Sequence, residues 1–330
     1  MAVILKADPL LSFAGRQDFM DRVKPYSIAV DGIVKGEQTF RVPEGPYANF
    51  DHHYGSDDIA TRSSFMQLYL EIKQGGFVDR FSKGGKLDVR MYADHGDEDV
   101  NGCYWALKNV DKIIKNENAR IRAFVDLCDK LDTTAGSFET GDTALRRRMA
   151  WMFKPYHDAR YNDRLGKMDA VKFNRMIRTI EGRISEYVSG GGKEVELKGG
   201  YEVIGTDDDH DKGNGWTFTR EHNAASRMVM YLDGIHTFAS LTGTKGKKMF
   251  TYVFGKKTDW EVDFDLPRFY DRLNKEDGDN VNEGNSWGGT RMRGGSPKIS
   301  GSRIGTGRFE EIINEEIEAL RAERKVLSKI

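Results

Sequence analysis

Three clusters of aspartates and histidines are the chemically distinctive part of this sequence. The triplet Asp51-His52-His53 places a carboxylate and two imidazoles in consecutive positions, a second cluster spans residues 95–99, and a third spans residues 126–132. Carboxylate oxygens and imidazole nitrogens suit Mn²⁺, Mg²⁺ or Fe²⁺, whereas a thiolate site would indicate zinc or an iron–sulfur cluster. We therefore expect these segments to converge on one polynuclear metal site.

The number of potential ligands is sufficient for two neighbouring cations, which need roughly six ligands and an activated water. Carboxylates at this density would repel one another without a cation between them. The alternative interpretation is that the clusters are solvated acidic turns and a surface histidine pair. The candidate ligands are Asp31, Asp51, His52, His53, His95, Asp97, Asp99, Asp126, Asp129 and Asp132.

Predicted strands lead into these clusters. Apolar runs with turn residues at their borders predict strands at residues 26–30, 47–50 and 87–93. They alternate with helical patterns, of which residues 63–74 and 101–115 are the clearest, and such alternation predicts an α/β domain with a mostly parallel sheet. Because ligands bind beyond the carboxyl ends of parallel strands, we expect Asp31, Asp51 and residues 94–99 at one edge of the sheet.

The pattern changes in the second half of the chain. Residues 146–198 are helical and highly charged, with a run of three glycines at 190–192, and we interpret them as a helical connector. The predicted domains are therefore 1–145, 146–198 and 199–330. The last is β-rich, with helices at 266–273 and 308–327 and a loop rich in Gly, Ser and Arg at 284–307.

The composition limits the classes of protein that fit. Hydrophobic residues make up 38% of the 330 residues and charged residues 31%, and the formal net charge is −1, so no global basic field indicates nucleic-acid binding. Two cysteines are too few for a disulfide framework and fit a reducing compartment. Neither a signal peptide nor an 18-residue apolar run is evident, so we expect a cytoplasmic protein with no membrane partner.

The residues around the histidine pair resemble a known family. Residues 49–55 (NFDHHYG), followed by 60–64 (ATRSS), resemble the signature of the DHH phosphoesterase superfamily, which includes RecJ exonucleases, oligoribonucleases, cyclic-dinucleotide phosphodiesterases and family II pyrophosphatases. Residues 132–138 are similar to its later aspartate–threonine–glycine–phenylalanine element, and residues 95–102 are similar to its paired-aspartate motif. In the family the paired-aspartate motif precedes the DHH triplet; here it follows, so the sequence resembles a permuted version.

The resemblance implies a phosphoesterase domain that binds two Mn²⁺ ions, with Mg²⁺ as the alternative. It places Asp31 at the end of a strand, where it would bridge the metals, and His95 in the position of the family's first ligand. Asp51 and His53 would be the catalytic residues, as supporting or substrate-facing groups, and Asp126 and Asp129 are further candidates. The implied metal ligands are Asp31, His52, His95, Asp97, Asp99 and Asp132.

Residues 287–298 resemble the glycine-rich substrate loop of the smaller α+β domain that accompanies DHH domains. Glycines let backbone N–H groups approach a phosphate closely, and arginines fork onto phosphate oxygens. The loop's usual terminal histidine is missing, and Ser296 and Lys298 lie in its surroundings. A flexible surface loop is the alternative. The implied substrate-binding residues are Gly288, Gly289, Arg291, Arg293, Gly294, Gly295, Ser296, Lys298 and Arg303.

These features predict a metal-dependent phosphoesterase that acts on a short oligonucleotide, a cyclic dinucleotide or a related nucleotide. Long single-stranded nucleic acid is disfavoured, because aromatic and basic residues do not interleave. A non-catalytic nucleotide-binding protein on the same fold, a pyrophosphatase or polyphosphatase, and an assembly protein with an acidic surface remain alternatives. The apolar face of helix 308–327, which includes Ile312 and Ile317, is expected to pack on its own domain, a homodimer being the alternative.

Overall fold

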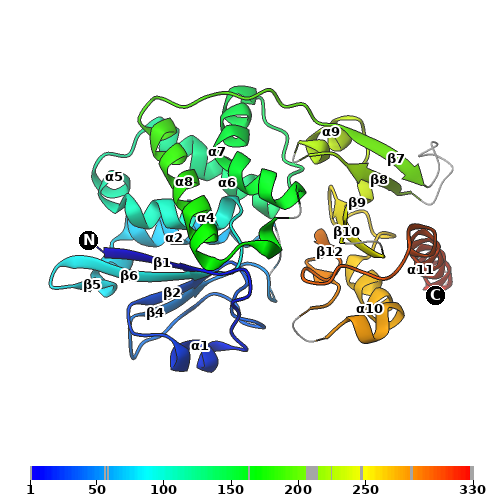
Figure 1. Ribbon diagram of the computed structural model, residues 1–330, viewed down its shortest axis with the longest axis horizontal. Helices are drawn as coiled ribbons and strands as arrows, with labels where there is room; N and C mark the ends of the chain where they lie inside the picture. The colour runs from blue at the N-terminus through cyan, green and yellow to red at the C-terminus, as the bar shows by residue number, and fades with distance from the viewer. Residues whose placement is uncertain are drawn as a thin grey trace. The chain divides into compact units, whose positions relative to one another are not determined.

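The computed structural model describes residues 2–55, 57, 59–162, 164–205, 215–223, 225–245, 248–282 and 285–327, without the side chains of 166 and 245. Within these residues the protein is a mixed α/β structure with two mixed sheets (Figure 1). The chain divides into two compact units, of which the first contains Met1–Thr133 and Phe138–Leu197 and the second Thr134–Ser137 and Lys198–Ile330. No helix in the described ranges is long and apolar enough to cross a membrane.

The sheet of the first unit has the strand order β1-β6-β2-β4-β3, with β5 paired to β6. Strands β1, β6, β2 and β4 are parallel to their neighbours, whereas β3 and β5 are antiparallel edge segments. The three predicted strands correspond to β2, β4 and β6. The bounds are β1 (Ala2–Ala7), β2 (Ser27–Val30), β3 (Phe40–Arg41), β4 (Tyr47–Phe50), β5 (Ser82–Lys83) and β6 (Lys86–Ala93).

Helices cover both faces of this sheet. Helix α1 (Arg16–Arg22) lies on one face, and α2 (Ser64–Gln74), α4 (Glu98–Lys108) and α8 (Ala170–Val188) lie on the other (Figure 1). Ser63 caps α2, because its hydroxyl accepts the N–H of Met66 at 3.2 Å. The remaining helices of the unit are α3 (Gly76–Arg80), α5 (Val110–Lys115), α6 (Ala119–Thr133), α7 (Thr143–Tyr161) and a 3₁₀ turn at Leu165–Lys167.

The predicted helix at 101–115 is interrupted at Asn109, which separates α4 from α5. The Asn109 side chain donates to the carbonyl oxygen of Trp105, a local bond that competes with the helical backbone pattern. Helices α7 and α8, which we interpreted as a connector, contribute buried residues such as Phe153 and Ile180 to the same core as Trp105 and Phe124. They are therefore part of the first unit.

The second unit contains a largely antiparallel sheet with the order β11-β12-β10-β9-β8-β7, in which only β8 and β9 run parallel among the paired strands. Its core stacks Tyr252 on Phe309 of α11, with ring centroids 4.2 Å apart, and buries Ile312 and Ile317, so the C-terminal helix packs on its own unit. The elements are β7 (Tyr201–Gly205), β8 (Thr217–Glu221), α9 (Ser226–Leu232), β9 (Thr237–Lys245), β10 (Met249–Lys256), α10 (Leu266–Asp277), a 3₁₀ turn (Gly278–Asn280), β11 (Gly288–Gly289), β12 (Arg293–Gly295) and α11 (Thr306–Leu327).

Candidate metal centre

Three adjacent parallel strands of the first unit deliver the predicted ligands to one edge of the sheet. Asp31 follows β2, the triplet Asp51-His52-His53 follows β4, and His95 lies two residues beyond β6. Because β2 pairs in parallel with both β4 and β6, the three carboxyl ends are neighbours. This clustering follows from topology and agrees with what the sequence predicts for the strand ends.

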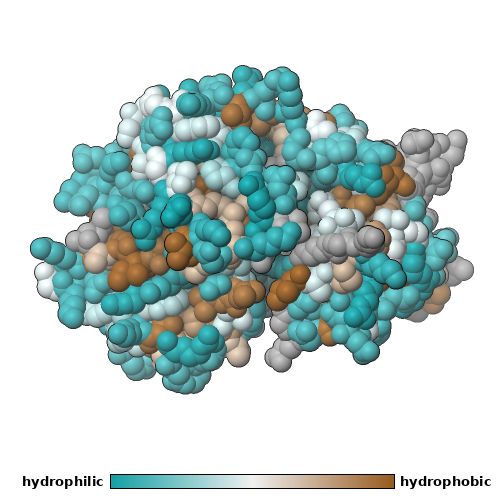
Figure 2. All heavy atoms as spheres, viewed as in Figure 1, coloured by the Kyte–Doolittle hydropathy of each residue, from teal (hydrophilic) through white to brown (hydrophobic). Residues whose placement is uncertain are grey.

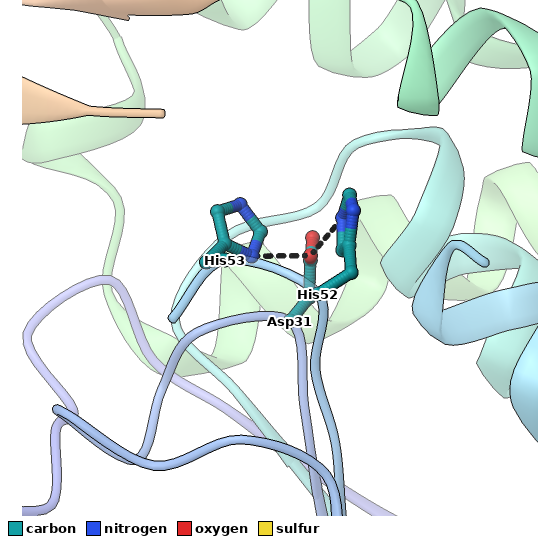
Figure 3. A group of neighbouring side chains, drawn as sticks. All are labelled: Asp31, His52 and His53. Carbon is teal, nitrogen blue, oxygen red and sulfur yellow. Dashed lines mark ion pairs between the residues drawn. The ribbon is translucent and has the colours of Figure 1, made fainter. Parts of the chain in front are cut away.

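Asp31 is the central side chain of the cluster. Its carboxylate is buried, and Oδ1 lies 3.4 Å from Nε2 of His52 and 3.3 Å from Nδ1 of His53 (Figure 3). Its other oxygen lies 2.6 Å from Nε2 of His95. The backbone of Asp31 is left-handed, with φ 60°, a conformation that aspartate tolerates better than most residues. Asp31 therefore faces imidazoles from two neighbouring strand ends.

Two further carboxylates come from the start of α4. Asp97 is its N-cap, with Oδ1 accepting the N–H of Val100 at 3.2 Å and Oδ2 3.3 Å from Nε2 of His95. Asp99 is buried in the first turn and accepts backbone N–H groups from Ser64 at 2.6 Å and Phe65 at 2.7 Å. Since those two residues begin α2, the Asp99 carboxylate joins the starts of two helices.

The last ligand candidate is Asp132, in the final turn of α6. Its Oδ2 lies 2.8 Å from Nε2 of His52, which also lies 3.9 Å from Oδ2 of Asp99. Three sets of donor atoms result, each with its members within 4.8 Å of one another, and they overlap through Asp31 and His52. The sets are Asp31-His52-His53, Asp31-His95-Asp97 and His52-Asp99-Asp132. This buried cluster could bind a metal ion.

The electrostatics show how closely the charges are packed. Burial, together with the carboxylates of Asp132 and Asp31, raises the pKa of Asp99 well above its usual value. Burial alone would lower the pKa of His95, but Asp97 and Asp31 raise it well above the usual range. Protons therefore compensate the buried carboxylates when no cation does so. Oδ1 of Asp31 is also buried without a hydrogen bond, which fits a ligand position for a metal.

The two predicted catalytic residues differ in their surroundings. Asp51 is buried, and its Oδ1 accepts the backbone N–H groups of His52 and His53 and lies 2.9 Å from Nδ1 of His53. It belongs to none of the three donor sets among the described residues and instead holds the turn that carries both histidines. The side chain of His53 is 30% exposed, so this imidazole is the most accessible of the triplet.

The remaining aspartates of the third cluster have other partners. Asp129 accepts the N–H of Ser63 and a guanidinium N–H of Arg62, both at 2.8 Å, and so fixes the loop before α2. Asp126 is exposed and pairs with Lys130 at 2.8 Å. Of the three aspartates in this cluster, only Asp132 therefore belongs to a donor set among the described residues. Asp129 and Asp126 instead form bonds that stabilise the loop before α2 and helix α6.

The glycine-rich segment of the second unit forms a β-hairpin, where we expected a loop, and Gly284 lies outside the described residues. A Cβ at Gly289 or Gly294 would collide with the backbone of the facing strand, and at Gly294 also with the hydroxyl of Tyr270. These glycines thus have a packing role. Ser296 is buried, and its hydroxyl accepts the N–H of Tyr252. Arg293 is half-buried, and the exposed basic side chains of the segment are Arg291, Lys298 and Arg303.

Helix α7 supplies groups near the centre that sequence analysis did not select. Nε2 of His157 lies 3.0 Å from Oε1 of Glu98, the residue between Asp97 and Asp99. Burial raises the pKa of the neighbouring Tyr156 to about 12, and the carboxylate of Asp97 contributes. In the sequence, this tyrosine–histidine pair is part of an ordinary helical pattern. Its position near the carboxylates cannot be inferred until it is known which elements that helix packs against.

Comparisons with protein-family models, curated proteins and solved structures gave no match.

Proposed function

We propose that the protein is a metal-dependent phosphoesterase with two divalent cations, Mn²⁺ or Mg²⁺, in the centre described above. The observation that carries this proposal is the overlap of the three donor sets through Asp31 and His52. Overlapping sets fit two neighbouring cations, because a residue shared by two sets would lie close to both. Oxygen and imidazole donors without a thiolate favour Mn²⁺ or Mg²⁺ over structural zinc.

The donor sets divide naturally between two positions. Asp31, His95 and Asp97 would hold one cation, and His52, Asp99 and Asp132 would hold the other, while the third set, Asp31-His52-His53, links the two positions. The two N–H groups that Asp99 accepts, from Ser64 and Phe65, would keep its carboxylate oriented without a cation. When bound, such cations lower the pKa of water and neutralise phosphate oxygens.

The side chains around the donors suit the remaining tasks of phosphoester hydrolysis. Asp51 holds Nδ1 of His53, so the other ring nitrogen is available for the leaving-group oxygen of a substrate. Tyr156 and His157 place a phenol and an imidazole beside the carboxylates at the start of α4. A hydroxyl there can donate to a phosphate oxygen. The substrate we propose is a phosphodiester in a short oligonucleotide, a cyclic dinucleotide or a related nucleotide.

The first prediction is that the protein cleaves such a substrate and that chelator stops the reaction. The full-length protein is purified without chelator, its bound Mn, Fe and Zn are quantified, and it is incubated with Mn²⁺ and a panel of substrates. The panel contains a dinucleotide, a cyclic dinucleotide, a 5′-labelled oligonucleotide and pyrophosphate. Asp97→Ala and His52→Ala should each lower the rate by more than about 100-fold, because both remove a proposed metal ligand.

The matched control is Asp126→Ala, which removes an exposed aspartate of the same helix that carries Asp132. It should leave both metal content and rate unchanged. If pyrophosphate is the only substrate cleaved, the proposed activity changes from phosphodiesterase to pyrophosphatase. Bound metal with every substrate intact would favour a nucleotide-binding protein, and full activity of Asp97→Ala or His52→Ala would contradict the proposed centre.

A further inference from the structure

A groove in the first unit lies between the end of strand β1 and helix α8. It has a volume of about 660 Å³ and is open to solvent on one side. Its apolar wall includes Leu5, Ala7, Leu11 and Tyr92, and α8 supplies the opposite wall. Figure 2 shows hydrophobic residues gathered over β1 in a largely hydrophilic face. The groove therefore has room for a ligand much larger than a phosphate ion.

The width of this groove is fixed by one side chain of α8. The amide of Asn174 donates to the carbonyl oxygen of Ala7 at 2.6 Å and accepts the N–H of the same residue at 3.5 Å. Because β1 is an edge strand, the N–H and the carbonyl oxygen of Ala7 have no partner on a neighbouring strand. The side-chain amide of Asn174 forms these hydrogen bonds instead. The end of β1 and the turn of α8 around Asn174 are thus held at a constant separation.

Two guanidinium groups line the groove without a partner in the described part of the chain. Arg175 and Arg178 are three positions apart on α8 and exposed, and neither side chain forms an ion pair or a hydrogen bond with any described residue. In contrast, Arg183 further along α8 donates to the carbonyl oxygen of Trp151 at 2.6 Å. The groove's one carboxylate, on Asp8, already accepts the N–H of Leu10. With Lys6, the lining carries a positive excess.

The groove and the metal centre share the same edge of the sheet. Asp8 donates its N–H to the carbonyl oxygen of Ala93, so it lies beside the residues that lead from β6 to His95. Gly96, between His95 and Asp97, is packed against Met176 and Ile177, which belong to the same turn of α8 as Arg175. The backbone at Asp8 and Gly96 thus connects the lining of the groove to the segment that carries His95 and Asp97.

We propose that this groove binds a second anionic group of the substrate, a phosphate of a nucleotide, through Arg175 and Arg178, while Leu11 and Tyr92 contact the nucleoside. Guanidinium groups suit phosphate because they donate paired hydrogen bonds. The volume has room for a whole nucleotide, so the groove can hold the nucleoside as well as the phosphate. This inference rests on the proposed function, because it assigns the groove to the non-reacting part of that substrate.

The test uses full-length protein treated with chelator, so that nothing is hydrolysed. The probes are a 5′-phosphorylated dinucleotide and the same dinucleotide without its 5′-phosphate, and their Kd values are measured by titration calorimetry. The wild type should bind the phosphorylated probe more tightly. Arg175→Gln and Arg178→Gln should each weaken its binding about tenfold, since a hydrogen bond to a charged group is lost. The double variant should bind both probes equally.

The matched control is Lys172→Gln, an exposed cation of α8 outside the groove that pairs with Asp169. It should bind both probes as the wild type does, and circular dichroism should show all variants folded. Wild-type affinity of the double variant for the phosphorylated probe would overturn the inference, even if the protein is an active phosphoesterase. If the arginine variants bind the phosphorylated probe more weakly but the wild type cleaves no substrate, the groove binds the phosphate as proposed. The proposed phosphoesterase function is then wrong.

Discussion

Asp31 combines an unfavourable backbone conformation with the central side chain of the candidate metal centre. Its φ of 60° lies in the left-handed region, which costs a non-glycine residue roughly 1 kcal/mol, and Gly32 continues in the same region at φ 76°. The turn aims the carboxylate at His52, His53 and His95. Strain at a residue with this many polar contacts is typical of functional sites.

Asp31→Asn should separate metal binding from folding. Asparagine tolerates the left-handed region and preserves the side-chain shape, so the variant should still fold in chelator, with a lower free energy of unfolding because the ion pair with His95 is lost. Mn²⁺ affinity should fall by more than about 100-fold, because a neutral amide is a much weaker ligand than a carboxylate. Calorimetric Mn²⁺ titration and urea unfolding measure the two effects. Unchanged Mn²⁺ affinity would show that Asp31 is not a ligand.

Most ligand candidates could be predicted from the sequence because they follow a recognisable strand or open a helix. Asp31, His52 and Asp97 are examples. The difference between Asp132 and Asp129 could not be predicted, since both lie in one helical pattern and only the position of Arg62 and Ser63 shows which face each aspartate occupies. His157 was missed for the same reason, because its partner Glu98 is 59 positions away.

At the scale of elements, the close approach of α2 and α4 determines where Asp99 lies. Gly102 of α4 sits against the ring of Phe65, and a Cβ at this position would overlap that ring. Phe65 is also one of the two residues whose N–H groups bind Asp99. The absence of a side chain at Gly102 therefore lets the carboxylate reach the start of α2.

Gly102→Ala should destabilise the protein, although alanine is the better helix former. Overpacking against Phe65 costs about 1–3 kcal/mol, more than the roughly 1 kcal/mol gained in helix propensity. The control is Gly182→Ala in α8, where nothing lies within 4 Å of the added Cβ and where stability should rise by about 0.5–1 kcal/mol. Urea unfolding followed by circular dichroism measures both; a stabilised Gly102→Ala protein would contradict the described contact.

Helix and strand positions were largely predictable, whereas the unit to which each belongs was not. Residues 143–188 show helical periodicity, but periodicity cannot tell which core receives the apolar face, and α7 and α8 pack into the first unit. Strand β1 was not predicted either, because its exposed positions include the apolar Ala2 and Ile4, so the alternation between exposed and buried positions is not visible in the sequence. The glycines of β11 and β12 indicated a loop, but glycine is required at these positions because the two strands of a hairpin pack closely there.

At the scale of the whole molecule, the two units have separate hydrophobic cores. Phe124 and Ile180 belong to the core of the first unit, and Tyr252 and Phe309 to that of the second. All three donor sets lie in the first unit. A ligand of the centre therefore stabilises one of two cores directly.

Thermal unfolding by differential scanning calorimetry should show two transitions, because separate cores unfold as separate cooperative units. Added Mn²⁺ should raise the Tm of the first unit's transition by several degrees and leave the other within about one degree, since binding to the folded state adds stability by mass action. Asp31→Asn should remove the Mn²⁺ effect. Equal shifts of both transitions would show that the units unfold together.

The division of the chain into units also sets an order of events during synthesis. Residues 134–137 belong to the second unit, so the chain leaves the first unit after Thr133 and returns to it at Phe138 for α7 and α8. On a ribosome, every donor from Asp31 to Asp132 emerges before these two helices do. Domains fold as units during synthesis. If the centre binds a cation as proposed, its donors are complete in the nascent chain before α7 and α8 arrive to finish the core of the first unit.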